Sequence, residues 1–116
     1  MHEIEFFRLK NGKCPIIDFL DDQPGNVAQK ITWVLKLIEE SDKIPKSFFK
    51  KLVNSDNIYE CRIIVGNNTY RILAFLDVGN KIILTHGFQK KSQKTPKNEI
   101  VKAEKYKKEY LSTKRK

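Results

Sequence analysis

The sequence predicts an α+β domain in which helices pack on one face of a small antiparallel sheet. Three observations support this fold class. Apolar residues recur at helical spacing between residues 26 and 41, three strand-like runs follow between residues 58 and 88, and a second helical pattern comes after them. With 116 residues the chain is long enough to bury a core. We expect a single domain over residues 1–111 and a basic tail over residues 112–116.

The first half of the chain predicts one strand and two helices. Residues 4–9 (IEFFRL) read as a short strand. Pro15 then suits the first turn of a short helix that ends at Pro24. Residues 26–41 give the clearest helix, because their apolar side chains recur every three or four positions. Residues 42–57 predict a loop or another short helix.

The second half predicts an antiparallel meander followed by a helix. The turn signals GNNT and DVGN separate three strand-like runs. These runs cover residues 58–66, 69–77 and 81–88. Thr95 can cap a helix whose first residue is Pro96, and the helical pattern continues to about Leu111.

The apolar pattern of the first hairpin predicts which side chains share a face. A two-residue turn at Asn67-Asn68 collects apolar residues on one face, as a floor for the helices. Glu60, Arg62 and Arg71 then lie on the face away from the helices, with the two arginines as diagonal neighbours. A slip of one residue would place Arg71 among the apolar side chains. We therefore predict the two-residue turn.

The second hairpin leaves its register open. A two-residue loop at Gly79-Asn80 places His86 and Phe88 on the arginine face, and so does a four-residue DVGN loop. A three-residue loop turns both away from that face.

Positive charge is concentrated at the C-terminal end. The formal net charge is +9. Residues 90–116 hold eleven Lys and Arg against three Glu, whereas residues 1–89 hold twelve basic residues against eleven acidic ones. A clustered basic surface is typical of proteins that bind a polyanion. A solvated lysine-rich helix and tail that keep the protein soluble is the alternative explanation.

Several classes of function find no support in the sequence. No apolar run approaches the ~20 residues that span a bilayer, and the N-terminus lacks the apolar stretch of a signal peptide, so we expect a cytoplasmic protein without membrane contact. Cys14 and Cys61 share no metal or redox spacing. We therefore expect neither a metal nor another cofactor.

The residues predicted on the arginine face suit an RNA phosphodiester. Arginines grip phosphate in a bidentate manner, lysines add charge at the rim, and an exposed Phe88 can stack on an unpaired base. Cleavage without metal uses the 2′-OH of the RNA as nucleophile, and the protein must move protons and stabilise the phosphorane. Taken singly, each residue also has an ordinary structural role, such as an exposed ion pair between Glu60 and Arg62.

Residues 58–110 resemble a known protein family. The stretch YECRI…YRILAFLDVGNKIILTHGFQKKSQKTPKNEI…A…Y is similar to the RelE/HigB-type toxins of bacterial type II toxin–antitoxin systems, and most of all to their phage-derived branch. Its most specific part is H-G-F-x-K-K-x-x-K-T-P. Cys61 stands where this branch usually has Leu, a tolerable change on a core face.

The resemblance implies a RelE-like fold and an mRNA endoribonuclease (mRNA interferase) that acts in the ribosomal A site. It implies partners as well: mRNA, the ribosome, and a cognate antitoxin that usually carries a helix-turn-helix domain, so that DNA is contacted only through the antitoxin complex. The basic positions of the family fall on Arg62, Arg71, Lys90, Lys91 and Lys94.

These inferences give a set of expected site residues and leave the general base open. His86, Glu60 and a lysine such as Lys90 are the candidates for the base. The RNA-binding set is Phe88 with the lysines that follow it, namely Lys91, Lys94 and Lys97. The alternative to a toxin nuclease is a non-catalytic module that binds RNA or the ribosome. A DNA-binding repressor is disfavoured, because no helix-turn-helix pattern with a basic second helix is present.

Overall fold

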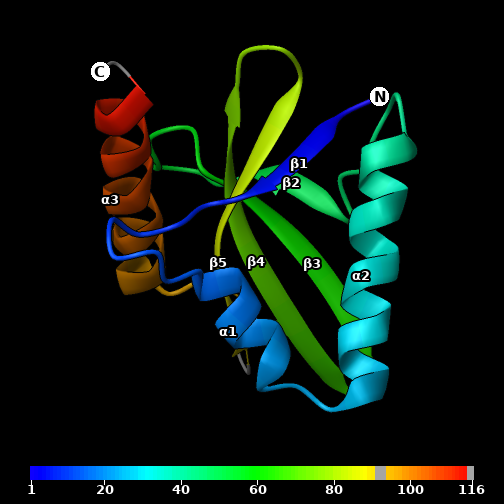
Figure 1. The fold of residues 1–116 in the computed structure, drawn as a ribbon. Coiled ribbons are helices and arrows are strands. Elements are labelled where there is room, and N and C mark those ends of the chain that lie inside the picture. The colour runs from blue at the N-terminus through cyan, green and yellow to red at the C-terminus, as the bar shows by residue number, and fades with distance from the viewer. Residues whose placement is uncertain (91–93, 115–116) are drawn as a thin grey trace.

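The computed structural model describes residues 1–90 and 94–114, with Lys90 described by its backbone only. Within this part of the chain, one mixed sheet of five strands lies between helices, which confirms the α+β class (Figure 1). The strand order is β1-β5-β4-β3-β2. The elements are β1 (Glu3–Phe6), α1 (Pro15–Asp21), α2 (Gly25–Glu40), β2 (Phe49–Lys51), β3 (Tyr59–Val65), β4 (Asn68–Asp77), β5 (Lys81–Lys90) and α3 (Lys97–Lys114).

The sheet differs from the prediction at both of its edges. The meander β3-β4-β5 is antiparallel as expected, but β1 pairs with β5 in parallel. At the other edge β2 pairs antiparallel with β3, in a segment for which the sequence predicted a loop or a short helix. An edge strand of three residues carries too little periodic signal to be recognised from the sequence.

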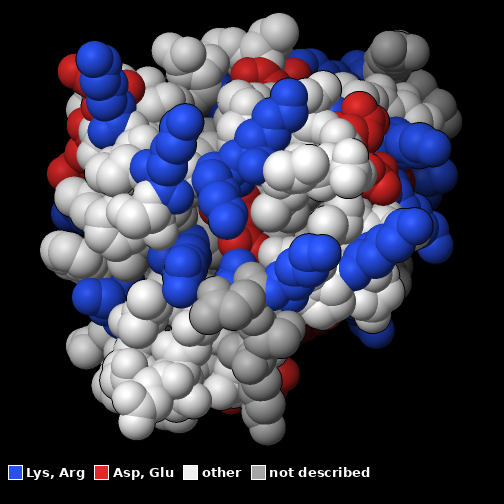
Figure 2. Space-filling model, turned by 180° about the vertical axis from the view of Figure 1, so that it is seen from behind, with Lys and Arg blue, Asp and Glu red and all other residues white. Residues whose placement is uncertain are grey.

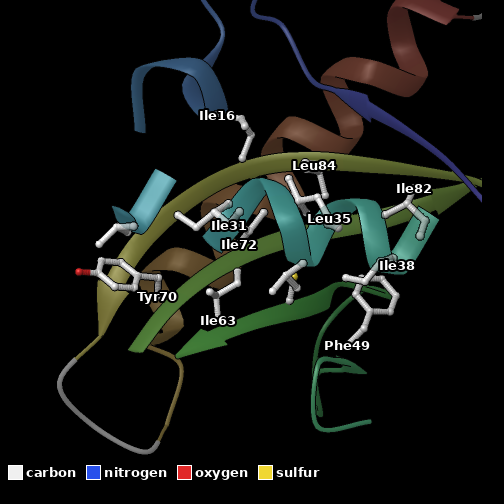
Figure 3. Close-up of a cluster of buried hydrophobic side chains, with 14 of the residues drawn as sticks. Ile16, Ile31, Leu35, Ile38, Phe49, Ile63, Tyr70, Ile72, Ile82 and Leu84 are labelled. Atoms are coloured by element: carbon white, nitrogen blue, oxygen red, sulfur yellow. The ribbon is translucent and has the colours of Figure 1, made fainter. Parts of the chain in front are cut away.

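The helices occupy both faces of the sheet, and the expectation that they share one face was wrong for α3. The side chains of α1 and α2 pack against Cys61, Ile63 and Ile72 in the first core (Figure 3). The helix α3 packs on the other face, where Ala103 joins a second apolar cluster with Leu73. The physical reason is that this second face is also apolar over β4 and β5, so it too must be removed from water.

The first hairpin turns one residue earlier than predicted. Val65 pairs with Asn68, so the two turn residues are Gly66 and Asn67. Gly66 has a φ of +60°, as the first central residue of a type II′ turn requires. The predicted register is therefore displaced by two residues, which leaves every side chain on its predicted face. Arg62 and Arg71 are direct cross-strand partners, not diagonal neighbours.

In the second hairpin, His86 and Phe88 lie on the face of the arginines because of two features, a three-residue loop and a β-bulge. Asp77 pairs with Lys81, so the loop has three residues, the length that would turn His86 away. A β-bulge then shifts the register between Leu73 and Ala74, because Thr85 stands as an extra residue between their partners. The bulge reverses the faces again, and His86 and Phe88 return to the face of the arginines.

The helix α3 is longer and better anchored than the sequence predicts. It continues to Lys114, so residues 112–114 of the predicted tail are helical, and residues 115–116 lie outside the described residues. Asp77 at the end of β4 accepts hydrogen bonds from Lys114 (2.6 Å) and Tyr110 (2.7 Å). These two bonds, with Lys114 first, lower the pKa of Asp77 to about 2. At its other end the helix begins at Lys97, after Pro96.

Candidate functional site

A groove of about 1160 Å³ opens on the α3 side of the sheet, next to β2. Its floor includes Arg71, one wall carries the end of β2 and the following loop, and the opposite wall carries the start of α3. Its lining residues are Lys50, Lys51, Leu52, Val53, Asn54, Arg71, Lys94, Thr95, Pro96, Lys97, Ile100, Val101 and Glu104. Figure 2 shows Lys and Arg side chains gathered over this side of the molecule, around a hollow with an acidic group at its bottom.

The floor of the groove contains a buried ion pair. Arg71 and Glu60 are only 3% and 1% exposed. The Nη1 group of Arg71 donates to Glu60 Oε2 over 2.5 Å. The other carboxylate oxygen, Oε1, accepts a hydrogen bond from the hydroxyl of Thr95. The side chain of Thr95 therefore contacts the sheet. The sequence had predicted that it caps α3, but α3 begins only at Lys97, two residues later.

Arg62 lies beside this pair on the same face of the sheet. It is the cross-strand partner of Arg71, and its side chain is half-buried. Its Nε atom is buried without a hydrogen-bond partner. A buried N–H group without a hydrogen-bond partner is costly, so this part of Arg62 is not stabilised by the protein itself. The prediction that the two arginines share a face is confirmed. Arg62 is not among the residues that line the groove, so its reach to a ligand there stays a prediction.

His86 lies on the predicted face, but α3 covers it. It is 4% exposed; its Nδ1 is 3.0 Å from Thr85 Oγ1 and its Nε2 is 3.1 Å from Glu99 Oε1. Burial lowers the pKa of His86 below its ordinary value of 6.5, although the carboxylate of Glu99 opposes this effect. Both ring nitrogens are thus engaged beneath the helix.

Phe88 is half-buried and packs against other rings. It stacks on His86 with ring centroids 5.9 Å apart, and it lies against the second core. Its cross-strand partner is Arg71. The ring is therefore close to the arginines, but part of its surface is already used in packing against α3.

The predicted lysines divide into three groups. Lys94 and Lys97 are exposed and line the groove. Lys90 is paired through its backbone with Thr69 at the end of β5. Lys91 lies outside the described residues.

Sequence reasoning missed the cations of β2. Lys50 is the cross-strand partner of Glu60, and both Lys50 and Lys51 line the groove from the edge strand. The signal was the pair itself, which follows two phenylalanines in SFFKKLV and which we assigned to a loop or short helix. A strand there places Lys50 on the face of Glu60, where it adds positive charge opposite Lys94 and Lys97.

Three other kinds of site were considered for the described residues: a reactive thiol, a metal site and a membrane-spanning helix. Burial raises the pKa of Cys61 to about 12, so its thiol stays protonated and is no nucleophile at neutral pH. Among residues 1–90 and 94–114, no group of three or more acidic, histidine or cysteine side chains is placed to hold a metal ion. Within the same residues, none of the helices combines the length and apolar character that crossing a bilayer requires. The groove offers guanidinium and ammonium groups, a set suited to binding phosphate.

Comparisons with known proteins give one family match. Residues 18–108 match the model of the family described as phage-derived protein Gp49-like (DUF891). No curated protein matches the sequence. Among solved structures, the chain is similar to one in the RelB-RelE antitoxin-toxin complex from Methanococcus jannaschii, with 23% identity, a TM-score of 0.48, and coverage of 74% of this chain and 87% of that chain. A likeness this loose assigns neither a function nor a partner.

Proposed function

Because the chain belongs to the phage-derived Gp49-like family, and because its motif resembles the RelE/HigB-type toxins, we propose that it is the toxin of a type II toxin–antitoxin system. In this proposal it is an endoribonuclease that cuts ribosome-bound mRNA and thereby inhibits translation. The observation that carries the proposal is the groove with Arg71 on its floor and Lys50, Lys94 and Lys97 on its walls. A chain of phosphates is the ligand whose charge complements such a groove.

The proposed reaction requires no metal. The 2′-oxygen of one nucleotide attacks the adjacent phosphorus, and the 5′-oxygen of the next nucleotide leaves. The products are a 2′,3′-cyclic phosphate and a 5′-hydroxyl. A base removes the 2′-OH proton, and an acid protonates the leaving oxygen. Arg62 and Arg71 are proposed to stabilise the extra negative charge on the phosphorane, an effect typically worth ~10²–10³ in rate for a single donor.

The candidates for the proton acceptor are His86, Glu60 and the lysines. The imidazole of His86 lies beneath α3 and the carboxylate of Glu60 is paired with Arg71. Lys94 and Lys97 are exposed residues on the wall of the groove. Their accessibility favours a lysine, such as one of these or Lys90, for the handling of protons.

The proposed partners follow from the same assignment. The mRNA in the ribosome is the substrate, and a cognate antitoxin with a helix-turn-helix domain neutralises the toxin in the cytoplasm. Induction of this chain is expected to stop growth, and co-expression of the neighbouring reading frame is expected to restore it. Unimpaired growth on induction, at a verified level of soluble protein, contradicts a toxin function.

The direct test uses purified protein, mRNA-programmed ribosomes and analysis of the new RNA ends. We expect cleavage that leaves a 2′,3′-cyclic phosphate and a 5′-hydroxyl. A message with a single 2′-deoxynucleotide at the cleavage position is the matched control, and it should resist cutting there. A 3′-hydroxyl product, or efficient cleavage of the deoxy-substituted message, argues against the proposed chemistry.

The lysines of the groove can be tested through salt dependence. Replacement of Lys50, Lys94 and Lys97 by Ala should reduce the slope of log K against log [salt] for single-stranded RNA by about 2, since each phosphate contact contributes about 0.7. Replacement of Lys30, Lys36 and Lys43, which are exposed on or next to α2, is the control of equal charge change. Equal slopes for the two triple variants would show that the groove is not the RNA site.

One observation favours the alternative of a non-catalytic RNA- or ribosome-binding module. Both His86 and Glu60, the two proton acceptors other than lysine that the sequence suggested, are buried and engaged. A module of this kind would give a mobility shift with RNA or ribosomes and no cleaved product, at any protein concentration.

A further inference from the structure

Glu60 joins three parts of the groove, two through its carboxylate and one through its backbone. Oε2 holds Arg71 on β4, Oε1 accepts from Thr95 in the segment that leads into α3, and the backbone of Glu60 faces Lys50 on β2. Arg71, Thr95 and Lys50 all line the groove. Glu60 itself is not among the lining residues, so it supports the groove from beneath.

The burial of this ion pair is not explained by stability alone. Removing two charges from water costs several kcal/mol per ion, and a buried ion pair is often no more stabilising than apolar side chains of the same volume. What such a pair supplies is a fixed geometry: the guanidinium of Arg71 is held at one orientation by a charge-assisted hydrogen bond. The second oxygen fixes Thr95 in the same way, and with it the backbone next to Lys94.

The same contacts make Glu60 a poor proton acceptor. Its two oxygens already accept from Arg71 and Thr95, and it is 1% exposed. To reach a 2′-OH it would have to release one of these partners and come to the surface of the groove.

We propose that Glu60 is a positioning residue, which orients Arg71 and the segment of Lys94 and Thr95 toward a phosphate of single-stranded RNA. It does not receive the proton of the reaction. The identity of the ligand rests on the proposed function, whereas the orientation of Arg71 by Glu60 is a property of the protein alone.

The direction of the change in RNA affinity distinguishes a positioning role of Glu60 from an effect of its charge alone. Glu60 is an anion next to a site for anions, so the loss of its charge by itself strengthens RNA binding. If Glu60 positions Arg71, its loss weakens binding instead. Glu104 also lines the groove, and its carboxylate accepts from the backbone N–H of Asp56. The variant Glu104→Gln therefore reports the effect of charge alone.

The first measurement compares Glu60→Gln with Glu104→Gln in RNA binding and cleavage. We expect Glu60→Gln to weaken binding of a single-stranded RNA and to lower kcat by about 10²-fold, the usual result of misplacing a catalytic group by about 1 Å. Glu104→Gln should bind RNA more tightly than the wild type, because the groove then holds one anion fewer. If Glu60→Gln binds and cuts as Glu104→Gln does, Glu60 has no positioning role.

A double-mutant cycle then asks whether Glu60 acts through Arg71. In an Arg71→Ala background, Glu60→Gln should cause a much smaller loss than in the wild type, because one of the two groups that it positions is absent. Equal losses in the two backgrounds would assign Glu60 a separate role, such as that of a base, and would overturn the proposal. Thr95→Val removes one of the two hydrogen bonds without changing charge, and it serves in place of Glu60→Gln if that variant does not fold. It should weaken cleavage more in the wild type than in Arg71→Ala.

A measurement without RNA distinguishes failure of this proposal from failure of the proposed function. In ¹⁵N NMR spectra, the Nη groups of Arg71 should give separate signals in the wild type, because pairing with Glu60 hinders rotation of the guanidinium. In Glu60→Gln these signals should merge. If the wild-type protein neither binds nor cuts RNA, the proposed function fails, while separate Nη signals that merge in Glu60→Gln still support the positioning of Arg71. Signals unchanged by Glu60→Gln overturn it.

Discussion

The two faces of the sheet are built from the same strands but differ in chemistry. Facing α1 and α2, the strands present Cys61, Ile63, Ile72 and similar apolar side chains, which form the first core. Facing α3, the same strands present Leu73 and other apolar residues over β4 and β5, and charged residues toward β3 and β2. The helix α3 covers the apolar part of this second face, and the groove occupies the part beside it.

With the proposed function, this difference separates stability from RNA chemistry across one sheet. The first face needs only apolar side chains that fill the space under α2. The second face holds the buried pairs Arg71–Glu60 and His86–Glu99, which are expensive to bury. We therefore expect mutations on the first face to change stability alone, and mutations on the second to change stability and RNA chemistry together. The following predictions test this division, from the largest expected effect to the smallest.

The largest effect is expected for Arg71→Ala. The substitution leaves the carboxylate of Glu60 buried without its cation, which typically costs about 3–5 kcal/mol in the free energy of unfolding. Arg62→Ala removes a half-buried guanidinium with no hydrogen bond at its Nε, so we expect a loss within about 1 kcal/mol. Both variants should lose cleavage. Denaturant titration measures the free energy of unfolding of both variants. Equal values for Arg71→Ala and Arg62→Ala would contradict the structural role of the ion pair.

Ile31→Ala tests the first face. Ile31 in α2 is fully buried in the first core, and truncation of such a side chain costs about 2–5 kcal/mol. Cleavage per folded molecule should stay at the wild-type level, because Ile31 packs on the α2 side of the sheet and the groove opens on the α3 side. A large loss of kcat in the fraction that remains folded would mean that the two faces are coupled.

Gly87→Ala tests the close approach of α1 to β5. A Cβ atom at residue 87 would lie 2.5 Å from Phe19 Cδ2 and 2.9 Å from its Cγ, so the ring or the helix must move. Overpacking of this kind costs about 1–3 kcal/mol. Gly25→Ala is the control, because a Cβ there meets no atom within 4 Å. Thermal unfolding of the two variants should show a clear loss for Gly87→Ala only, and Phe19→Ala should relieve that loss in the double variant.

The smallest effect concerns pH. Because burial lowers the pKa of His86 in the folded protein, the unfolded chain takes up its proton more readily as the pH falls below 6.5. The contribution of His86 to stability is therefore full above pH 6.5 and declines as the pH falls toward the folded pKa. An NMR titration of the His86 ring should give a midpoint below 6.5, and Glu99→Gln should lower it further. A midpoint at or above 6.5 would contradict the effect of burial, and any activity that follows His86 should show the same lowered inflection.

Side chains alternate between the two faces of a sheet, and this alternation explains why the residues lie on their predicted faces although the predicted strand pairing was wrong. The register of the first hairpin was displaced by two residues, and side chains alternate with a period of two, so Glu60, Arg62 and Arg71 kept their face. In the second hairpin a three-residue loop and the bulge at Thr85 reversed the face of His86 twice. The sequence contains no local signal for that bulge, and the loop types considered did not include it.

The sequence by itself determined the order of most elements, the alternation of the meander and the concentration of lysines before and along α3. These are local properties, set by the spacing of apolar residues and by turn chemistry. Only the tertiary structure decided that α3 covers the second face, that Glu60 is buried against Arg71 and Thr95, and that Lys50 joins the groove. Each of these depends on contacts between segments far apart in the chain, where the burial of one apolar surface fixes which charged groups are enclosed and which remain open to a ligand.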